Sequence, residues 1–178
     1  ASFALGNGVQ KCLEYLKNFH FTDEDIEYLR SQKIFSEEYL NYLRTIKFTG
    51  DVYAVPDGTV VLPNEPAITI VAPLIQAQLV ETALLVMFNH SSLITSKTSR
   101  IVRSAKGRAV MEFGTRRAQG SEAAVEGAVD AYVGGAVGTA CTLAGKLYGV
   151  PVLGTMAHSF VQSFDSEYVA FKAYALSF

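Results

Sequence analysis

The feature that most constrains the fold is a unit repeated through residues 106–178. A short apolar run is followed by a polar loop containing glycine and then by a helical segment, and this order recurs along the region. The apolar runs are 109–113, Val133 with the glycines after it, and 150–153. Strands that alternate with helices are typical of parallel sheets with right-handed crossovers. We therefore predict parallel βα units whose strand-ending loops carry the chemistry.

Residues 1–105 have a different texture. Apolar spacings of three and four over residues 9–48 predict helices, with N-terminal caps at Thr22 and Ser36. From Asp51 onward, β-branched side chains interrupted by Pro and Gly predict hairpins of a small antiparallel sheet. The sequence thus indicates an α/β chain with a helical and antiparallel-β part, 1–105, and a βα part, 106–178.

Residues 74–105 close the first part with a long amphipathic pattern. Its apolar positions predict one connecting helix whose packed face includes Leu79, Ala83, Val86 and Leu93. The basic residues near its end complement the negative end of a helix dipole. They are Lys97, Arg100, Arg103 and Lys106.

Composition excludes several classes of function. The formal net charge is -2 and basic residues form only short clusters, so no general nucleic-acid binding is expected. No apolar stretch is long enough to span a bilayer. Two cysteines cannot build a disulfide framework, which favours a reducing, cytoplasmic location. An initial Ala and an apolar final segment without a cap predict a piece of a longer protein, the alternative being a natural end that frays.

The first predicted loop, 114–120, places Arg116 beside Arg117 directly after Phe113 and Gly114. A guanidinium group matches a carboxylate or phosphate with two parallel hydrogen bonds. The pair therefore indicates anion recognition, although two adjacent surface arginines can also serve solubility alone.

The second predicted loop, 134–139, is rich in glycine and ends in Gly138 and Thr139. Such a loop can present free amides to a phosphate at a helix N-terminus. Its spacing does not match a Walker loop.

The third predicted loop, 154–159, contains His158 and Ser159. Histidine there can act as an acid, a base, a metal ligand or a nucleophile. A hydrolase triad is disfavoured because no Gly-x-Ser-x-Gly elbow exists, and a metal site because no partner ligand lies at suitable spacing. His20 and His90 lie in helical segments, and we expect them to be structural.

These motifs together closely resemble the nicotinate phosphoribosyltransferase family. The resemblance covers essentially the whole chain, and its motifs are highly specific in combination. They are 112–120, Gly138 with Thr139, 143–145 and 150–159, together with 21–26, 61–66 and 81–85.

The resemblance implies a fold and a reaction. The fold would be an irregular type II phosphoribosyltransferase α/β barrel, incomplete here, with a smaller helical and antiparallel-β domain. The reaction would convert nicotinate and phosphoribosyl pyrophosphate to nicotinate mononucleotide and pyrophosphate, the first step of NAD salvage. It would require Mg²⁺ and be coupled to ATP hydrolysis, in a cytoplasmic homodimer with active sites near the interface.

The resemblance also implies roles for individual residues. His158 would be phosphorylated transiently by ATP, and Ser159 would lie beside it in the substrate site. Phe113 would stack on the pyridine ring, while Gly138 and Thr139 would line the base pocket. Arg116 and Arg117 would bind the carboxylate or the phosphate, in an order that the sequence leaves open.

Two departures and three alternatives accompany this interpretation. Many relatives carry Asn where Cys141 stands, and the family's N-terminal tyrosine-bearing segment and C-terminal half are absent. We therefore expect this chain alone to leave the barrel open and to turn over poorly. A relative that uses nicotinamide binds its amide through an aspartate after the Gly-Thr turn, where Ala140 stands here. A relative that uses quinolinate fits less well, since it uses no phosphohistidine. The third alternative is a catalytically silent assembly module of the same fold.

Overall fold

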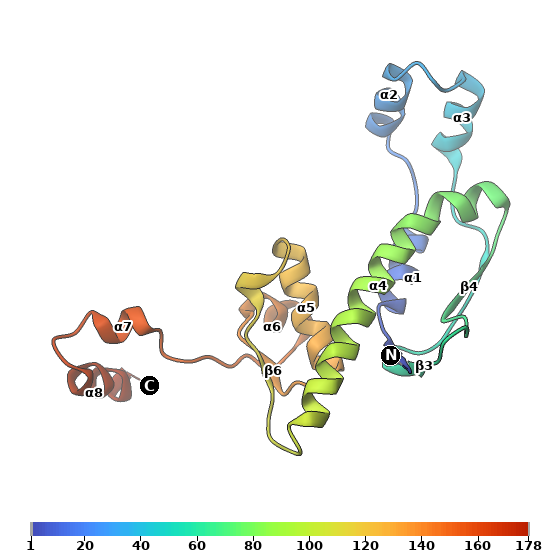
Figure 1. The fold of residues 1–178 in the computed structure, drawn as a ribbon. Helices are drawn as coiled ribbons and strands as arrows, with labels where there is room; N and C mark the ends of the chain where they lie inside the picture. Colours follow the sequence, from blue (N-terminus) through green and yellow to red (C-terminus); the bar gives the residue numbers. More distant parts are fainter. Residues whose placement is uncertain (1, 178) are drawn as a thin grey trace.

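A computed structural model describes residues 2–177. Its central element is the long helix α4 (Leu74–Ser104), shown in Figure 1. Elements from both parts of the chain pack on it: β1 and α1 from the N-terminal part, and α5 from the C-terminal part. The long connecting helix predicted over 74–105 is therefore confirmed. None of the described helices is both long and apolar enough to cross a membrane.

The N-terminal part contains three short helices and four short strands among the described residues. They are β1 (Ala4–Gly6), α1 (Val9–Lys17), α2 (Asp23–Ser31), α3 (Glu37–Thr45), β2 (Asp51–Ala54), β3 (Thr59–Val61) and β4 (Ile68–Val71). Both predicted caps are confirmed: Thr22 forms a capping box with Asp25, and the Ser36 hydroxyl accepts a bond from the amide of Tyr39. Each cap satisfies an amide that the first helical turn leaves without a partner.

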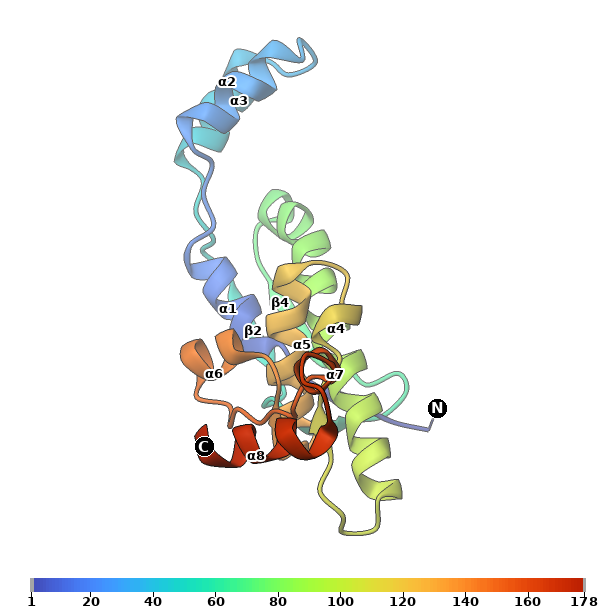
Figure 2. The ribbon, with the colours of Figure 1, turned by 90° about the vertical axis from the view of Figure 1, so that its left-hand side faces the viewer.

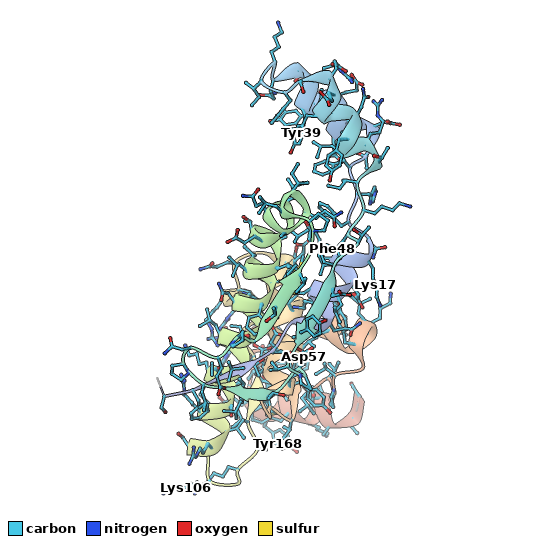
Figure 3. The ribbon with its side chains drawn as sticks, turned by 90° about the vertical axis from the view of Figure 1, so that its right-hand side faces the viewer. Lys17, Tyr39, Phe48, Asp57, Lys106 and Tyr168 are labelled. Atoms are coloured by element: carbon cyan, nitrogen blue, oxygen red, sulfur yellow. The ribbon has the colours of Figure 1, made fainter. Side chains whose placement is uncertain are left out.

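The helices α2 and α3 project from the rest of the molecule as an antiparallel pair (Figure 2). Figure 3 shows Tyr39 on this pair, and Lys106 at the opposite end of the molecule, beyond the end of α4. A cluster of apolar side chains joins the pair to α1 and the first half of α4. Its buried members are Cys12, Leu16, Phe19, Ile26, Leu40, Leu43, Ile46, Val80 and Leu84.

The strands of this part do not form the predicted hairpins. β1 pairs with β3, and β2 pairs with β4, each antiparallel. The Pro56-Asp57-Gly58 turn therefore joins strands of two different two-stranded sheets. Asp57 has another role, because its carboxylate accepts the amides of Val9 at 2.8 Å and Gln10 at 3.4 Å. It caps α1 from a distance, where the preceding Gly8, with a φ of 100°, has no side chain to do so.

The predicted packed face of α4 is wrong at two of its four positions: Leu79 and Ala83 are half-buried, but the second half of the helix buries a polar face instead. Leu93 is 69% exposed and Val86 is 64% exposed. The Ser96 hydroxyl instead accepts the amide of Leu5 at 2.8 Å, and the Ser92 hydroxyl accepts the amide of Asn7 at 3.0 Å. These hydroxyls satisfy the edge of β1 that faces away from β3, which explains why small polar residues lie there.

The C-terminal part begins with two βα units. Its elements are β5 (Met111–Glu112), the 3₁₀ turn η1 (Thr115–Arg117), α5 (Ser121–Val133), β6 (Gly138–Thr139), α6 (Thr142–Tyr148), α7 (His158–Gln162) and α8 (Glu167–Ser177). β5 and β6 are parallel, with Glu112 opposite Thr139, which confirms the predicted strand direction. The second strand starts later than predicted, because Val133 completes α5.

The third apolar run, 150–153, pairs with β6 through a single parallel bridge between Thr139 and Val152. The amide of Thr139 donates to the carbonyl of Pro151, and the amide of Leu153 donates to the carbonyl of Thr139, both at 2.9 Å. The described residues thus form an open set of parallel segments in the order β5, β6, 150–153. Residues 2–177 contain no closed sheet, so the barrel itself remains a prediction.

The close approach of β6 to the third run gives a testable result for Gly138→Ala. A Cβ at this position would lie 2.5 Å from the carbonyl oxygen of Pro151 and 2.9 Å from a methyl carbon of Leu153. That carbonyl cannot retreat without losing its bond to the amide of Thr139. We expect the free energy of unfolding to fall by about 2 to 3 kcal/mol in urea titrations.

Gly154→Ala is the matched control for that substitution, because no atom lies within 4 Å of the added methyl group. It should leave the urea midpoint almost unchanged. Equal midpoints for Gly138→Ala and the wild type would show that the packing of β6 against 150–153 is not tight.

Candidate substrate site

The parallel strands β5 and β6 end side by side at the candidate site, and a hydrogen bond between two side chains joins them. The Thr139 hydroxyl, which is fully buried, donates to a Glu112 carboxylate oxygen at 2.7 Å. The same hydroxyl accepts the amide of Cys141 at 2.9 Å, at the start of α6. The other Glu112 oxygen accepts the amide of Gly114. Glu112 therefore fixes both strand ends, and neither of its oxygens lacks a donor.

The loop between α5 and β6 does not offer the free amides that the sequence predicts. The amides of residues 134–136 donate to carbonyls of α5, and the amide of Val137 donates to the carbonyl of Val110 at 2.8 Å. Gly138 and Thr139 are buried in the strand itself. The prediction of a phosphate seat in this loop is wrong, because strand pairing and the helix end use its amides. Gly138 and Thr139 instead pair with the neighbouring segments and help to hold the strand ends together.

The loop after β5 presents the two arginines on the surface. Phe113 is half-buried, while Arg116 and Arg117 are exposed on the η1 turn. The amide of Arg117 donates to the carbonyl of Gly114 at 2.7 Å, which tightens the turn. Neither guanidinium group forms an ion pair within residues 2–177. Both are thus available to an anionic ligand.

A cavity of about 590 Å³ lies between α4, α5 and the segment 112–119. Arg117 is one of its lining residues, together with His90 and Lys97 of α4. The sequence interpretation took His90 as structural and Lys97 as a helix-end charge. Only their contact with a loop about 20 residues away in the sequence shows that they share a cavity with Arg117.

His158 lies apart from this cavity. It is the first residue of α7, it is exposed, and Ser159 beside it is exposed as well. Figure 1 shows α7 and α8 separated from the unit of α5, β6 and α6 by an extended segment. Within residues 2–177, therefore, the arginines and the imidazole do not line one cavity, and their predicted convergence remains a prediction.

A buried polar network behind the site was missed by the sequence interpretation. The Asn7 amide nitrogen donates to the hydroxyl of Thr95 at 2.8 Å and to the carboxylate of Asp130 at 2.9 Å. Asp130 is 1% exposed, and burial raises the pKa of its carboxyl, while the nearby Lys11 lowers it. The network holds α5 against α4 and β1. No local sequence signal marks it, since Asn7 is 88 residues from Thr95 and 123 residues from Asp130 in the sequence.

Mg²⁺ is a further expectation of the family resemblance, which leaves its ligands open. Within residues 2–177, no group of three or more His, Cys, Asp or Glu side chains could hold a metal ion. Mg²⁺ is commonly held through substrate phosphates with only one or two carboxylates.

Comparisons with known proteins identify the family. Residues 1–89 match the model of the nicotinate phosphoribosyltransferase (NAPRTase) N-terminal domain. A nicotinate phosphoribosyltransferase of Mycobacterium tuberculosis is 49% identical over 174 residues, which are 98% of this chain and 38% of the relative. One of Bacillus subtilis is 44% identical over 173 residues, 97% of this chain and 35% of the relative.

Solved structures agree with the sequence relatives. The human nicotinic acid phosphoribosyltransferase superposes with a TM-score of 0.84 at 35% identity, covering 92% of this chain and 33% of the human chain. A nicotinate-nucleotide pyrophosphorylase of Pyrococcus furiosus has the same fold, with a TM-score of 0.75 at 24% identity over 97% of this chain and 36% of its own. The chain thus spans little more than a third of the length of these relatives. It belongs to the nicotinate phosphoribosyltransferase family.

Proposed function

We propose that this chain provides part of an active site that forms nicotinate mononucleotide and pyrophosphate from nicotinate and phosphoribosyl pyrophosphate. The observation that carries the proposal is the junction of two parallel strand ends, which Glu112 and Thr139 join and which Phe113 and the two arginines follow directly in the chain. Ligands of parallel α/β folds bind at such strand ends. Membership of the family and the names of the relatives support the same reaction. The product would enter NAD salvage.

Each residue of the strand ends has a physical role in this proposal. Phe113 offers an aromatic face to the pyridine ring. Arg116 or Arg117 binds the carboxylate of nicotinate or a phosphate through its planar fork. Gly138 brings the backbone of β6 close to the neighbouring run, and Thr139 locks Glu112 in place, so that the floor beneath the ligand is rigid.

The electrostatics of the strand ends favour nicotinate over nicotinamide. An amide NH₂ group is bound best by an acceptor aimed at it. The Glu112 oxygens are directed at Thr139 and Gly114, and Ala140, which follows Thr139, has no side-chain acceptor. Two unpaired guanidinium groups are, in contrast, suited to a carboxylate.

ATP coupling through His158 is part of the proposal. A neutral imidazole nitrogen would attack the γ-phosphorus of ATP, the bond to the β-phosphate oxygen would break, and ADP would leave. The phosphorylated imidazole would return its phosphoryl group to water during turnover. The exposure of His158 supports the proposal, because the ring is accessible to a nucleotide. Mg²⁺ would screen the phosphates of both co-substrates, without a ligand cluster from residues 2–177.

A homodimer is proposed for the active enzyme. Large apolar side chains are exposed on α4 and α8, and such patches mark surfaces that another chain or segment covers. Leu93 of α4 is 69% exposed, and Tyr168 and Leu176 of α8 are 73% and 79% exposed. These faces are candidates for the contacts that complete the active site.

Labelling with ATP tests the proposed role of His158. We expect γ-labelled ATP to transfer label to the protein that carries this sequence, in a form that is stable to base and labile to acid. His158→Asn should abolish the label, because no other imidazole replaces the nucleophile. His20→Asn is the matched control and should keep the label. The His20 ring is exposed as well, but it lies in the N-terminal part of the chain, beside the carbonyl of Asn18.

Label that persists in His158→Asn would contradict the assignment of the phosphorylated residue. An absence of label in the wild type would favour the silent assembly module.

A further inference from the structure

The cavity between α4 and α5 contains two buried polar atoms without a partner. They are Nε2 of His90 and the hydroxyl oxygen of Thr115, and neither has a hydrogen-bond partner within residues 2–177. Both residues line the cavity, one from α4 and one from the η1 turn. A buried polar atom without a partner costs folding free energy, and one common reason to retain it is a ligand. Two such atoms at one cavity indicate a ligand with a polar end.

The charges around the cavity determine the sign of that polar end. Lys97 and Arg117 line it, and neither forms an ion pair within the described residues. Glu112 is the one carboxylate that lines it, and its oxygens already accept bonds from Thr139 and Gly114. The cavity therefore has an excess of positive charge and attracts an anion.

The rest of the lining is apolar and limits the class of anion. Ile94 and Ile101 line the α4 side, and alanines of α5 line the other. A volume of about 590 Å³ is within the usual range for small-molecule sites. The negative charge of Glu112 opposes a dianion more strongly than a monoanion. The cavity is best suited to a monocarboxylate with an apolar body.

We propose that this cavity is a second ligand site, which binds a small apolar monocarboxylate through Arg117, Lys97, His90 and Thr115. It adjoins the strand ends through Glu112 and Gly114, but Phe113, Gly138 and Thr139 do not line it. It also divides the adjacent arginines: Arg117 belongs to the cavity, and Arg116, which does not line it, is left to the strand-end site. The proposal does not depend on the reaction proposed above.

Calorimetric titration with benzoate and with inorganic phosphate tests this proposal on the protein that carries this sequence. We expect saturable benzoate binding that is weakened about tenfold or more by Arg117→Gln and by Lys97→Gln. Arg103→Gln, on the same helix as Lys97, is the matched control, because Arg103 does not line the cavity. It should leave benzoate affinity within about twofold of the wild type.

The His90 ring provides a readout that a loss of folding cannot imitate. Its NMR signals, assigned by their absence in His90→Phe, should shift as benzoate saturates the wild type and should shift clearly less in Lys97→Gln at the same concentration. Absence of saturable benzoate binding, equal weakening by Arg103→Gln and Lys97→Gln, or tighter binding of phosphate than of benzoate would each overturn the proposal. Formation of nicotinate mononucleotide, measured in parallel, shows separately whether the reaction proposal fails.

Discussion

Replacing Asn7 by alanine is expected to lower the free energy of unfolding by about 3 kcal/mol. The Asn7 amide nitrogen donates to Thr95 and to Asp130, and all three side chains are buried. Removing the donor leaves two acceptors in the interior that water does not reach, one of them a carboxylate. Because the network joins β1, α4 and α5, the loss should appear as one cooperative shift of the urea midpoint.

The pH dependence of that loss identifies Asp130 as the affected group. Burial raises the pKa of the folded-state Asp130 carboxyl, so its contribution to stability is greatest below the unfolded-state pKa and declines as pH rises through the folded-state pKa. Asn7→Ala removes a donor to the ionised form and should raise that folded-state pKa further. The cost of the substitution should therefore be larger at pH 8 than at pH 4.

Asn18→Ala is the matched control for this prediction. The Asn18 amide nitrogen also donates a hydrogen bond, to the carbonyl of Glu14 at 2.9 Å, but on the exposed end of α1. We expect it to cost less than about 1 kcal/mol at either pH. A cost for Asn7→Ala that is equally small, or that does not change with pH, would show that the network contributes little to the packing of α4 and α5.

Local signals predicted the helices well. The caps at Thr22 and Ser36 and the extent of α4 depend on residues within a few positions of each other, so the sequence contains the information directly. Parallel pairing of β5 with β6 was also predictable, because a helix must connect parallel neighbours.

Pairing between distant segments could not be predicted in the same way. β1 pairs with β3 across more than 50 residues, and the turn at Pro56 reads as a hairpin when only its own sequence is considered. Hydroxyls of α4 satisfy the free edge of β1, so a face with Ser92 and Ser96 is buried where periodicity favours Leu93. Tertiary hydrogen bonding overrides apolar periodicity at this face.

The sequence predicted only the part of the candidate site that lies in one contiguous motif. The motif around Phe113 and Arg116 is contiguous, and the structure places it at the strand end as expected. His90 and Lys97 reach their cavity through the packing of α4 on α5, which no local motif records. His158 lies on α7, beyond an extended segment, so its position relative to the strand ends depends on packing outside these units.

Substrate preference is the second large effect expected from the site. Nicotinate carries a carboxylate that the arginine guanidinium groups can bind through charge-assisted hydrogen bonds, whereas the neutral amide of nicotinamide gains no such attraction from the same cations. We expect kcat/KM for nicotinate to exceed that for nicotinamide by about 100-fold or more, because a misplaced polar group in a charged site is rejected strongly.

Arg116→Gln should remove most of that preference. The glutamine amide can still donate a hydrogen bond to the nicotinate carboxylate, but it lacks the positive charge that strengthens the bond. Arg103→Gln, on the last turn of α4, is the matched control and should keep it.

The most direct test is the rate of mononucleotide formation from phosphoribosyl pyrophosphate, with nicotinate and nicotinamide as alternative substrates. The assay uses the whole natural protein that contains residues 1–178. The strand-end assignment predicts rapid formation of nicotinate mononucleotide and little or no nicotinamide product. Equal rates with the two substrates, or a preference for nicotinamide, would contradict it.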